Sequence, residues 1–345
     1  MGLLIPNNRL KMLPPEVRMA HEYCFFLHDS FVRMLVEYEA AEAHLVNVPF
    51  SDAIERGRFS RLAREQDVIA ALRTLGRHTE ARRVILNTIT MAMVSDCGHH
   101  VYEALRCFEK RKIVPGFNLL RKPLLDSLTY LCWIAADEDA FYAAFTSGDP
   151  AMYTQKVIGN KRREIFAKAI HATSLDSILS ADDLVSSLFD AGNSDGLYKF
   201  FQHAVHLVTV ERIELKTSPE NFNFIFKHPF EDDVYFPLYA VLTRALLLLS
   251  QVVALLYERV KIMDSGARRA LNFRSINFIR LLYIADGAKI LGEVMNEVLG
   301  RHLECPGCNS SLKMTEHNVA RLLISDSFRC VACRKVHPFP FSWSF

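Results

Sequence analysis

The chain has 345 residues, of which 50% are hydrophobic and 23% are charged, and its formal net charge is +2. This composition is that of a folded globular protein, and it excludes an intrinsically disordered chain. The charge balance excludes attraction of nucleic acid or anionic membrane by the overall field, so such binding needs a local cluster of cations.

Apolar residues at three- and four-residue spacing predict helices over most of the chain up to residue 302. Ser51 and Asp52, followed by Glu55, are expected to cap the second helix. Val114-Pro115-Gly116 is expected to end a long helix, and Pro123 to lie in the early turns of the next one. Residues 211–230 alternate like a strand. The expected helices cover residues 15–45, a segment from 51, 79–112, 118–136, a polar segment after 150 to 172, 174–190, 195–208, 232–263 and 267–301.

The longest apolar stretch, residues 237–257, has the length of a membrane span. Arg244 lies inside it, and a central arginine costs a few kcal/mol in a bilayer, so a buried core helix is favoured. The N-terminus lacks the charged start and apolar core of a signal peptide. Because Cys24, Cys97 and Cys107, like Cys132, stand alone in apolar contexts, they suit a reducing compartment. We therefore expect a cytoplasmic protein that does not enter a membrane.

Two Cys-x-x-Cys pairs, Cys305–Cys308 and Cys330–Cys333, lie 21 residues apart near the end of the chain. Each pair can place two thiolates on one metal ion, and two pairs complete a tetrahedron. One structural Zn²⁺ is the favoured ion, and an iron–sulfur cluster or a redox dithiol is the alternative. The residues between the pairs are expected to form a β-hairpin that brings the pairs together.

This arrangement resembles the zinc ribbon family. CPGCNSSL stands where such ribbons usually have Cys-Pro-x-Cys-Gly, and FRCVACRKVHPF resembles their second knuckle and the strand that follows it. Asn309 and Arg334 replace the usual glycines; asparagine tolerates a positive φ, whereas Arg334 departs from the pattern. The expected fold is mainly α, a multi-helix bundle (residues 1–302, with a subdomain boundary near 78) and a small C-terminal β zinc ribbon (303–345).

Zinc ribbons bind nucleic acid, bind protein or close a fold. The cations of this one that we expect to face nucleic acid are Lys313, Arg321, Arg329, Arg334 and Lys335. The aromatic tail FPFSWSF either stacks on single-stranded bases or packs the ribbon onto the bundle. A further basic cluster in ERGRFSRLARE (55–65) is either a solvated helix face or, if it lies on the ribbon's side, part of a phosphate-binding track.

LLRKPLLDSLTYLCWI and LYKFFQHAVH resemble motifs of a bacterial family of uncharacterised helical proteins, which are similar in turn to HEPN and abortive-infection proteins. The resemblance implies a polar cluster inside the bundle made by Arg121, Asp126, Tyr198 and His206, which are therefore candidate catalytic residues. The alternative is that Arg121 and Asp126 only stitch helices together, since buried ions are kept when they are paired.

HEPN ribonucleases use an arginine followed four to six residues later by a histidine, commonly at a dimer interface. Arg73-Thr-Leu-Gly-Arg-His78 has this spacing, although Arg73 lacks the adjacent Asn or Asp of the active motif. The favoured hypothesis is a zinc-containing, non-enzymatic binding module for nucleic acid or a protein partner, in a phage-defence or stress system. A HEPN-like, metal-independent ribonuclease is the alternative, and a homo-oligomer is compatible with both.

Overall fold

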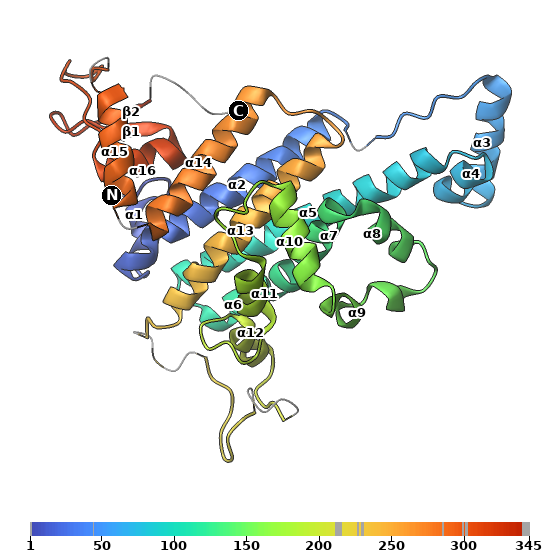
Figure 1. Ribbon diagram of the computed structural model, residues 1–345, viewed down its shortest axis with the longest axis horizontal. Coiled ribbons are helices and arrows are strands. Elements are labelled where there is room, and N and C mark those ends of the chain that lie inside the picture. Colours follow the sequence, from blue (N-terminus) through green and yellow to red (C-terminus); the bar gives the residue numbers. More distant parts are fainter. Residues whose placement is uncertain are drawn as a thin grey trace.

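The computed structural model of the protein describes residues 2–43, 45–210, 216–225, 228, 231–284, 286–298, 300 and 303–339. In this part of the chain, the only sheet has two antiparallel strands and lies near the C-terminus, which confirms a mainly α fold with a small C-terminal β element. Figure 1 shows an elongated bundle with the C-terminal module at one end and a projecting pair of helices at the other.

The helices and strands follow one another in this order: α1 (Asn7–Leu10), η1 (Pro15–Val17), α2 (Arg18–Ala40), α3 (Ala53–Glu65), α4 (Val68–Thr74), α5 (His78–Glu109), α6 (Ile113–Lys122), η2 (Pro123–Ser127), α7 (Leu128–Ala136), α8 (Glu138–Phe145), η3 (Pro150–Tyr153), α9 (Gln155–Gly159), α10 (Arg162–Ala172), α11 (Ala181–Phe189), α12 (Tyr198–Val205), α13 (Tyr235–Glu258), α14 (Ser265–Tyr283), α15 (Gly287–Val298), α16 (Glu316–Ser325), β1 (Ser327–Arg329) and β2 (Val336–Pro338).

Helix α13 is the centre of the bundle and packs against α2 and α7. Its leucines 246–249 are fully buried, because neighbouring helices cover it on all sides. By length and composition it is the one described helix that is apolar enough to cross a membrane, and 83% of its most apolar window is buried inside the protein. The burial is that of the core helix expected from the sequence.

A buried polar network joins α5 to α2, α13 and the N-terminal segment. The carboxylate of Glu109 accepts hydrogen bonds from Arg9 at 3.0 Å and from Arg106 at 2.6 Å. His21 Nε2 lies 3.3 Å from the same carboxylate, and its Nδ1 lies 2.5 Å from the hydroxyl of Tyr239. Burial works against ionisation of Glu109, but the bonds from His21 and Arg9 outweigh it and lower its pKa to about 2.

Three sequence-based predictions of helix ends were tested directly. Asp52 caps α3, its side chain accepting from the amide of Glu55 at 2.7 Å, as predicted. The prediction that residues 114–116 end a helix was wrong: α5 ends at Glu109, and Pro115 lies in the first turn of α6, where its missing N–H is not needed. Pro123 lies in the π-helical turn η2, between α6 and α7, rather than early in a helix.

Two other expected elements also differ. The helix expected over residues 267–301 is two helices: α14 ends at Tyr283 and α15 begins at Gly287. Between them Asp286 has φ of 59°, a left-handed conformation that a continuous right-handed helix does not contain. The strand-like segment 211–230 contains no strand among its described residues, 216–225 and 228; the rest of it lies outside the described residues.

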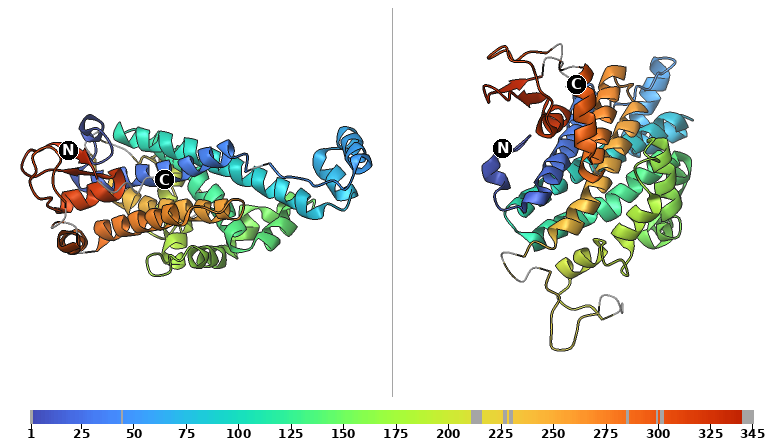
Figure 2. Two further views of the ribbon diagram at one scale, coloured as in Figure 1. Left: turned by 90° about the horizontal axis from the view of Figure 1, so that it is seen from above. Right: turned by 60° about the vertical axis from the view of Figure 1, so that its left-hand side comes forward.

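Helices α3 and α4 project from the end of the bundle opposite the C-terminal module (Figures 1 and 2). No residue of α3 is buried. The basic cluster of residues 56–64 is therefore on a remote lobe, and it does not form one phosphate-binding track with the C-terminal module. Helix α5 begins at His78, next to the expected subdomain boundary; the domain division itself stays a prediction.

The Glu109 network generates a test of folding energetics. We expect Glu109→Gln to lower the free energy of unfolding by about 3 kcal/mol at pH 7, because it leaves two arginines without their buried anion. Glu109 has a depressed folded pKa, so its contribution is complete above the ordinary glutamate pKa of 4.5 and is lost as the pH falls toward about 2. Urea unfolding across this range measures the difference.

Glu103→Gln is the matched control, since Glu103 is exposed on the same helix. A Glu109→Gln variant as stable as this control at pH 7 would show that the network contributes nothing.

Candidate metal centre and a polar pocket

Each Cys-x-x-Cys pair lies in a tight hairpin of the same kind. In the first hairpin the amide of Cys305 donates to the carbonyl of Ser310 at 2.9 Å. In the second hairpin the amide of Cys330 donates to the carbonyl of Lys335, also at 2.9 Å. Strands β1 and β2 extend the second hairpin, with Phe328 opposite His337. The same backbone turn therefore presents both cysteine pairs.

The residue after each pair adopts a left-handed backbone conformation. Asn309 has φ of 55° and Arg334 has φ of 64°. Their amides donate to the carbonyls of Cys305 at 2.8 Å and Cys330 at 3.0 Å, which closes each turn. These are the two positions at which zinc ribbons usually have glycine. The left-handed conformation costs a non-glycine residue roughly 1–2 kcal/mol, and asparagine less, so the backbone of Arg334 lowers the stability of its turn by about this amount.

The four sulfur atoms converge at one point. They all lie within 4.8 Å of one another, with Cys305 3.7 Å from Cys333 and Cys308 3.6 Å from Cys330. A tetrahedral site with metal–sulfur bonds of about 2.3 Å has edges of about 3.8 Å. The donor set and its spacing fit a metal ion, as the sequence predicted.

The surroundings of the thiols differ within the first pair. Burial raises the pKa of Cys305 to about 11. The hydroxyl of Ser310, 3.4 Å from the sulfur of Cys308, and the Ser310 amide lower the pKa of Cys308 to about 6. Backbone amides of the second turn lower the pKa of Cys330 as well. The lowered pKa values of Cys308 and Cys330 favour the thiolate, the form that a metal binds.

The segment between the pairs is a helix, α16, and not the β-hairpin expected from the sequence. Thr315 caps it, accepting from the amide of Asn318 at 3.2 Å. The buried side chain of Asn318 donates to the carbonyls of Lys313 at 2.8 Å and Arg329 at 3.1 Å, and accepts from the amide of Arg329 at 2.8 Å. One amide side chain therefore joins the chain leaving the first pair to the strand that enters the second.

Helix α16 turns its apolar side to the bundle, and polar bonds fix its position. Arg274 of α14 is buried and donates to the carbonyl of Leu323 at 2.6 Å, with Asp326 at 3.4 Å. Asn296 of α15 exchanges two hydrogen bonds with the backbone of Met314, at 2.7 and 2.9 Å. The metal-binding turns lie on the outer side, away from α13 (Figure 2).

The expected nucleic-acid contacts divide into two groups. Lys313, Arg334 and Lys335 are exposed, and Arg329 is half-buried with its guanidinium donating to the carbonyl of Arg334 at 3.1 Å. Arg321 is only 6% exposed, because α16 buries it against the N-terminal segment, where it donates to the carbonyl of Gly2 at 3.0 Å. Arg321 is therefore a structural residue in this fold, which corrects its expected place on the binding face.

The start of the aromatic tail packs inward. Phe339 is 4% exposed, and its ring meets that of Phe328 edge-on at 6.1 Å. Residues 340–345 lie outside the described residues.

The residues that match the ribonuclease spacing lie on the projecting lobe. Arg73 is on α4 and His78 is the first residue of α5, and both are exposed. No hydrogen bond joins them in the described part of the chain; Arg73 instead reaches the hydroxyl of Tyr142 at 3.4 Å. A catalytic role for this pair stays a prediction.

Three of the four positions expected in a polar cluster do meet. Arg121, Asp126 and Tyr198 line one pocket of about 420 Å³, which is formed where α6, η2, α9, α10, α11 and α12 converge. His206 does not line it and is exposed at the end of α12. Among the described residues Arg121 and Asp126 form no ion pair with each other, and the alternative that they only stitch helices together stays a prediction.

The sequence marks Arg162 only as a member of a basic cluster, either a solvated face or part of a phosphate-binding track; the structure shows that it completes this pocket from the first turn of α10. Its guanidinium lies 3.8 Å above the ring of Phe189 and donates to the side chain of Gln155 at 3.0 Å. The motif NKRRE (160–164) contained the signal, but its arginines cannot be told apart without the fold: Arg163, the next residue, is 73% exposed.

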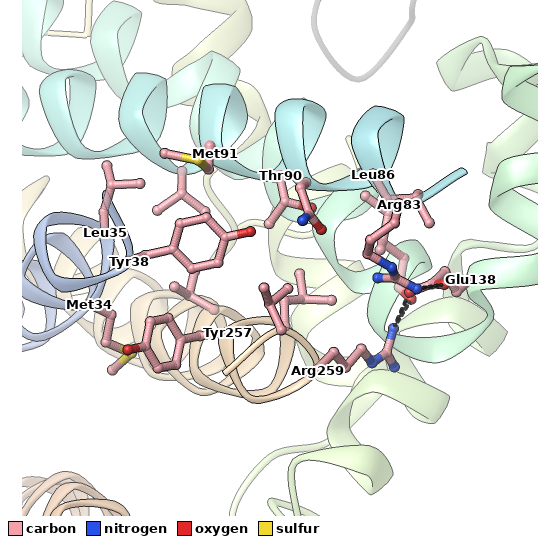
Figure 3. Close-up of a pocket in the computed structure, with 16 residues that line it drawn as sticks. Met34, Leu35, Tyr38, Arg83, Leu86, Thr90, Met91, Glu138, Tyr257 and Arg259 are labelled. Carbon is pink, nitrogen blue, oxygen red and sulfur yellow. Dashed lines mark hydrogen bonds and ion pairs between the residues drawn. The ribbon is translucent and has the colours of Figure 1, made fainter. Parts of the chain in front are cut away.

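A second pocket, between α2, α5 and α13, is lined mainly by apolar side chains, among them Tyr38 and Tyr257 (Figure 3). At one end Arg83 and Arg259 reach Glu138 at 2.9 and 3.3 Å. Its volume of about 40 Å³ holds little more than one water molecule, so it is a packing feature of the bundle.

Comparisons with protein-family models, curated proteins and solved structures find no match for this chain. Its function is therefore argued from the metal site and from the surfaces around it.

The metal site generates a direct test. We expect Cys305→Ser to reduce bound metal from one ion per chain to none, because three thiolates and a hydroxyl do not complete the tetrahedron. Metal analysis of the purified protein measures this. Cys107→Ser, which removes a half-buried cysteine outside the cluster, is the control and should leave the metal in place. Equal metal content in the two variants would disprove the site.

Proposed function

We propose that the four thiolates hold one structural Zn²⁺. Zinc favours four sulfur ligands in a tetrahedron, and such a site leaves no coordination position for a substrate. The distances of 3.6 and 3.7 Å between sulfur atoms support this choice. The ion keeps the two turns together, and the helix between them carries the module on the bundle. The lone cysteines of the bundle support a reducing, cytoplasmic location.

We infer further that the module is a binding surface for single-stranded nucleic acid, in a protein that is not an enzyme. One observation carries this proposal: the cations Lys313, Arg329, Arg334 and Lys335 form no ion pair with any described carboxylate. In the bundle, by contrast, several arginines contact a carboxylate oxygen at 3.3 Å or less; they include Arg9, Arg77, Arg82, Arg83, Arg111 and Arg259.

The charge of the metal centre limits how such a surface works. Zinc with four thiolates carries a net charge of −2, and Glu304 and Glu316 add two exposed carboxylates. Attraction must therefore come from the few cations on the outer side of the second turn, at short range. Arg329, Arg334 and Lys335 are close in the chain, and the bond between Arg329 and the Arg334 carbonyl holds two of them together. About three phosphate contacts are expected.

The number of contacts predicts the salt dependence. We expect the logarithm of the association constant for a short single strand to fall with the logarithm of salt concentration with a slope of about −2, because each phosphate contact releases roughly 0.7 counterion. Fluorescence anisotropy with labelled oligonucleotides measures this slope. In the double variant Arg334→Gly, Lys335→Gln, the slope should shrink by about 1.4.

Glycine suits the positive φ of Arg334, so this variant keeps the zinc site while it removes the charge. Arg58→Gln, Arg61→Gln removes the same charge from the remote lobe and is the control. Equal binding by both double variants would contradict the proposal. Binding to a protein partner alone would redirect it to that class of partner, and cleavage of RNA would favour the alternative at Arg73 and His78.

A further inference from the structure

The pocket between η2 and helices α6, α9, α10, α11 and α12 has the properties of a ligand site that is independent of the metal centre. Its volume of about 420 Å³ falls in the range of small-molecule pockets. Arg121, Asp126, Gln155 and Arg162 supply polar groups to its wall, and the rings of Phe189 and Tyr198 supply apolar ones. Five helices meet there, so the polar groups come from distant parts of the chain.

Buried donors in this wall have no acceptor in the described structure. They are the Nε atoms of Arg121 and Arg162 and the amide nitrogen of Gln155. A buried donor without an acceptor costs about 1–3 kcal/mol, and three of them around one cavity indicate that something else accepts their hydrogen bonds. Packing explains the position of Arg162, which lies on Phe189, but it does not supply that acceptor.

The charges of the wall define what the acceptor is. Arg121, Arg162 and the exposed Lys156 contribute three positive charges, and Asp126 contributes one carboxylate. Neither arginine forms an ion pair with Asp126, although all three line the cavity. Burial raises the pKa of Asp126 and lowers that of Arg162, and the attraction between the carboxylate and the two arginines only partly offsets this. The three cations and one carboxylate leave the wall with a net charge of +2, which balances that of a dianion.

We propose that this pocket binds a small organic phosphate, a phosphate monoester whose sugar or alcohol part carries hydroxyl groups. The guanidinium groups of Arg121 and Arg162 donate to the phosphate oxygens, an arrangement that the planar fork of arginine suits. The side chain of Gln155 holds the Arg162 fork at 3.0 Å, and Phe189 supports its face. The carboxylate of Asp126 accepts a hydrogen bond from a ligand hydroxyl, which separates an ester from free phosphate.

Isothermal titration calorimetry with the full chain tests this proposal, using ribose 5-phosphate, AMP, inorganic phosphate and ribose as probes. We expect ribose 5-phosphate or AMP to bind, ribose not to bind, and Arg162→Gln to weaken binding by at least about tenfold. Arg163→Gln is the control, since Arg163 is the next residue, is 73% exposed and pairs with the exposed Asp182. The two esters differ by the adenine base of AMP, so a comparison of their affinities shows whether the cavity accepts a nucleobase.

Two further variants keep the proposal open to refutation. Arg121→Gln repeats the test from another helix if Arg162→Gln does not fold, as judged by circular dichroism. Asp126→Asn is expected to abolish the preference for ribose 5-phosphate over inorganic phosphate. The proposal is overturned if none of the phosphate probes binds, if Arg162→Gln and Arg121→Gln bind as well as Arg163→Gln, or if inorganic phosphate binds as tightly as both esters.

Discussion

The convergence of four sulfur atoms is the constraint on which the C-terminal part of this protein depends. The two strands of the module have three residues each, too few to hold the cysteine turns in register without help. A module of this size has a small core, and a metal ion supplies the free energy that such a core lacks. Both turns also place a residue at positive φ, so they store strain that the closed site must offset.

The bundle determines which side of the module faces outward. Helix α16 buries its apolar side against the bundle, and Arg274 and Asn296 bind its two ends through backbone carbonyls and amides. Arg321 then fastens the N-terminal segment to the same helix. With this side occupied, the turn that carries Arg334 and Lys335 stays exposed on the outer side. Under the proposed function, the metal acts indirectly, by fixing the positions of these cations.

Residue spacing predicted the parts of the structure that depend on local chemistry. Two Cys-x-x-Cys pairs predict a four-sulfur site because the turn itself brings the two cysteines of each pair together. Asp52 caps a helix through a hydrogen bond from the amide of Glu55, only three residues away. Helix α16 was missed, although Thr315 and the apolar residues after it carry a capping and helical signal. The comparison with zinc ribbons led to a hairpin instead.

Contacts between segments that are distant in the chain could not be predicted from the sequence. Arg321 is one of several similar cations in the sequence, and only the packing of α16 against Gly2 buries it. Arg162 and Arg163 are neighbours of the same type. Successive residues of a helix point about 100° apart around its axis, so Arg162 lies on Phe189 and Arg163 faces solvent. The meeting of Arg121, Asp126 and Tyr198 was expected from a resemblance, whereas the donors that complete their pocket were not.

Hydrogen exchange of the backbone amides of α16, measured with zinc bound and after its removal by a chelator, tests the central claim most directly. The claim is that the metal holds the module on the bundle. We predict that residues 316–325 lose their protection when zinc is removed, while those of the buried helix α13 keep theirs. Equal protection of α16 in both states would show that the bundle holds the module without the metal, and would contradict the account.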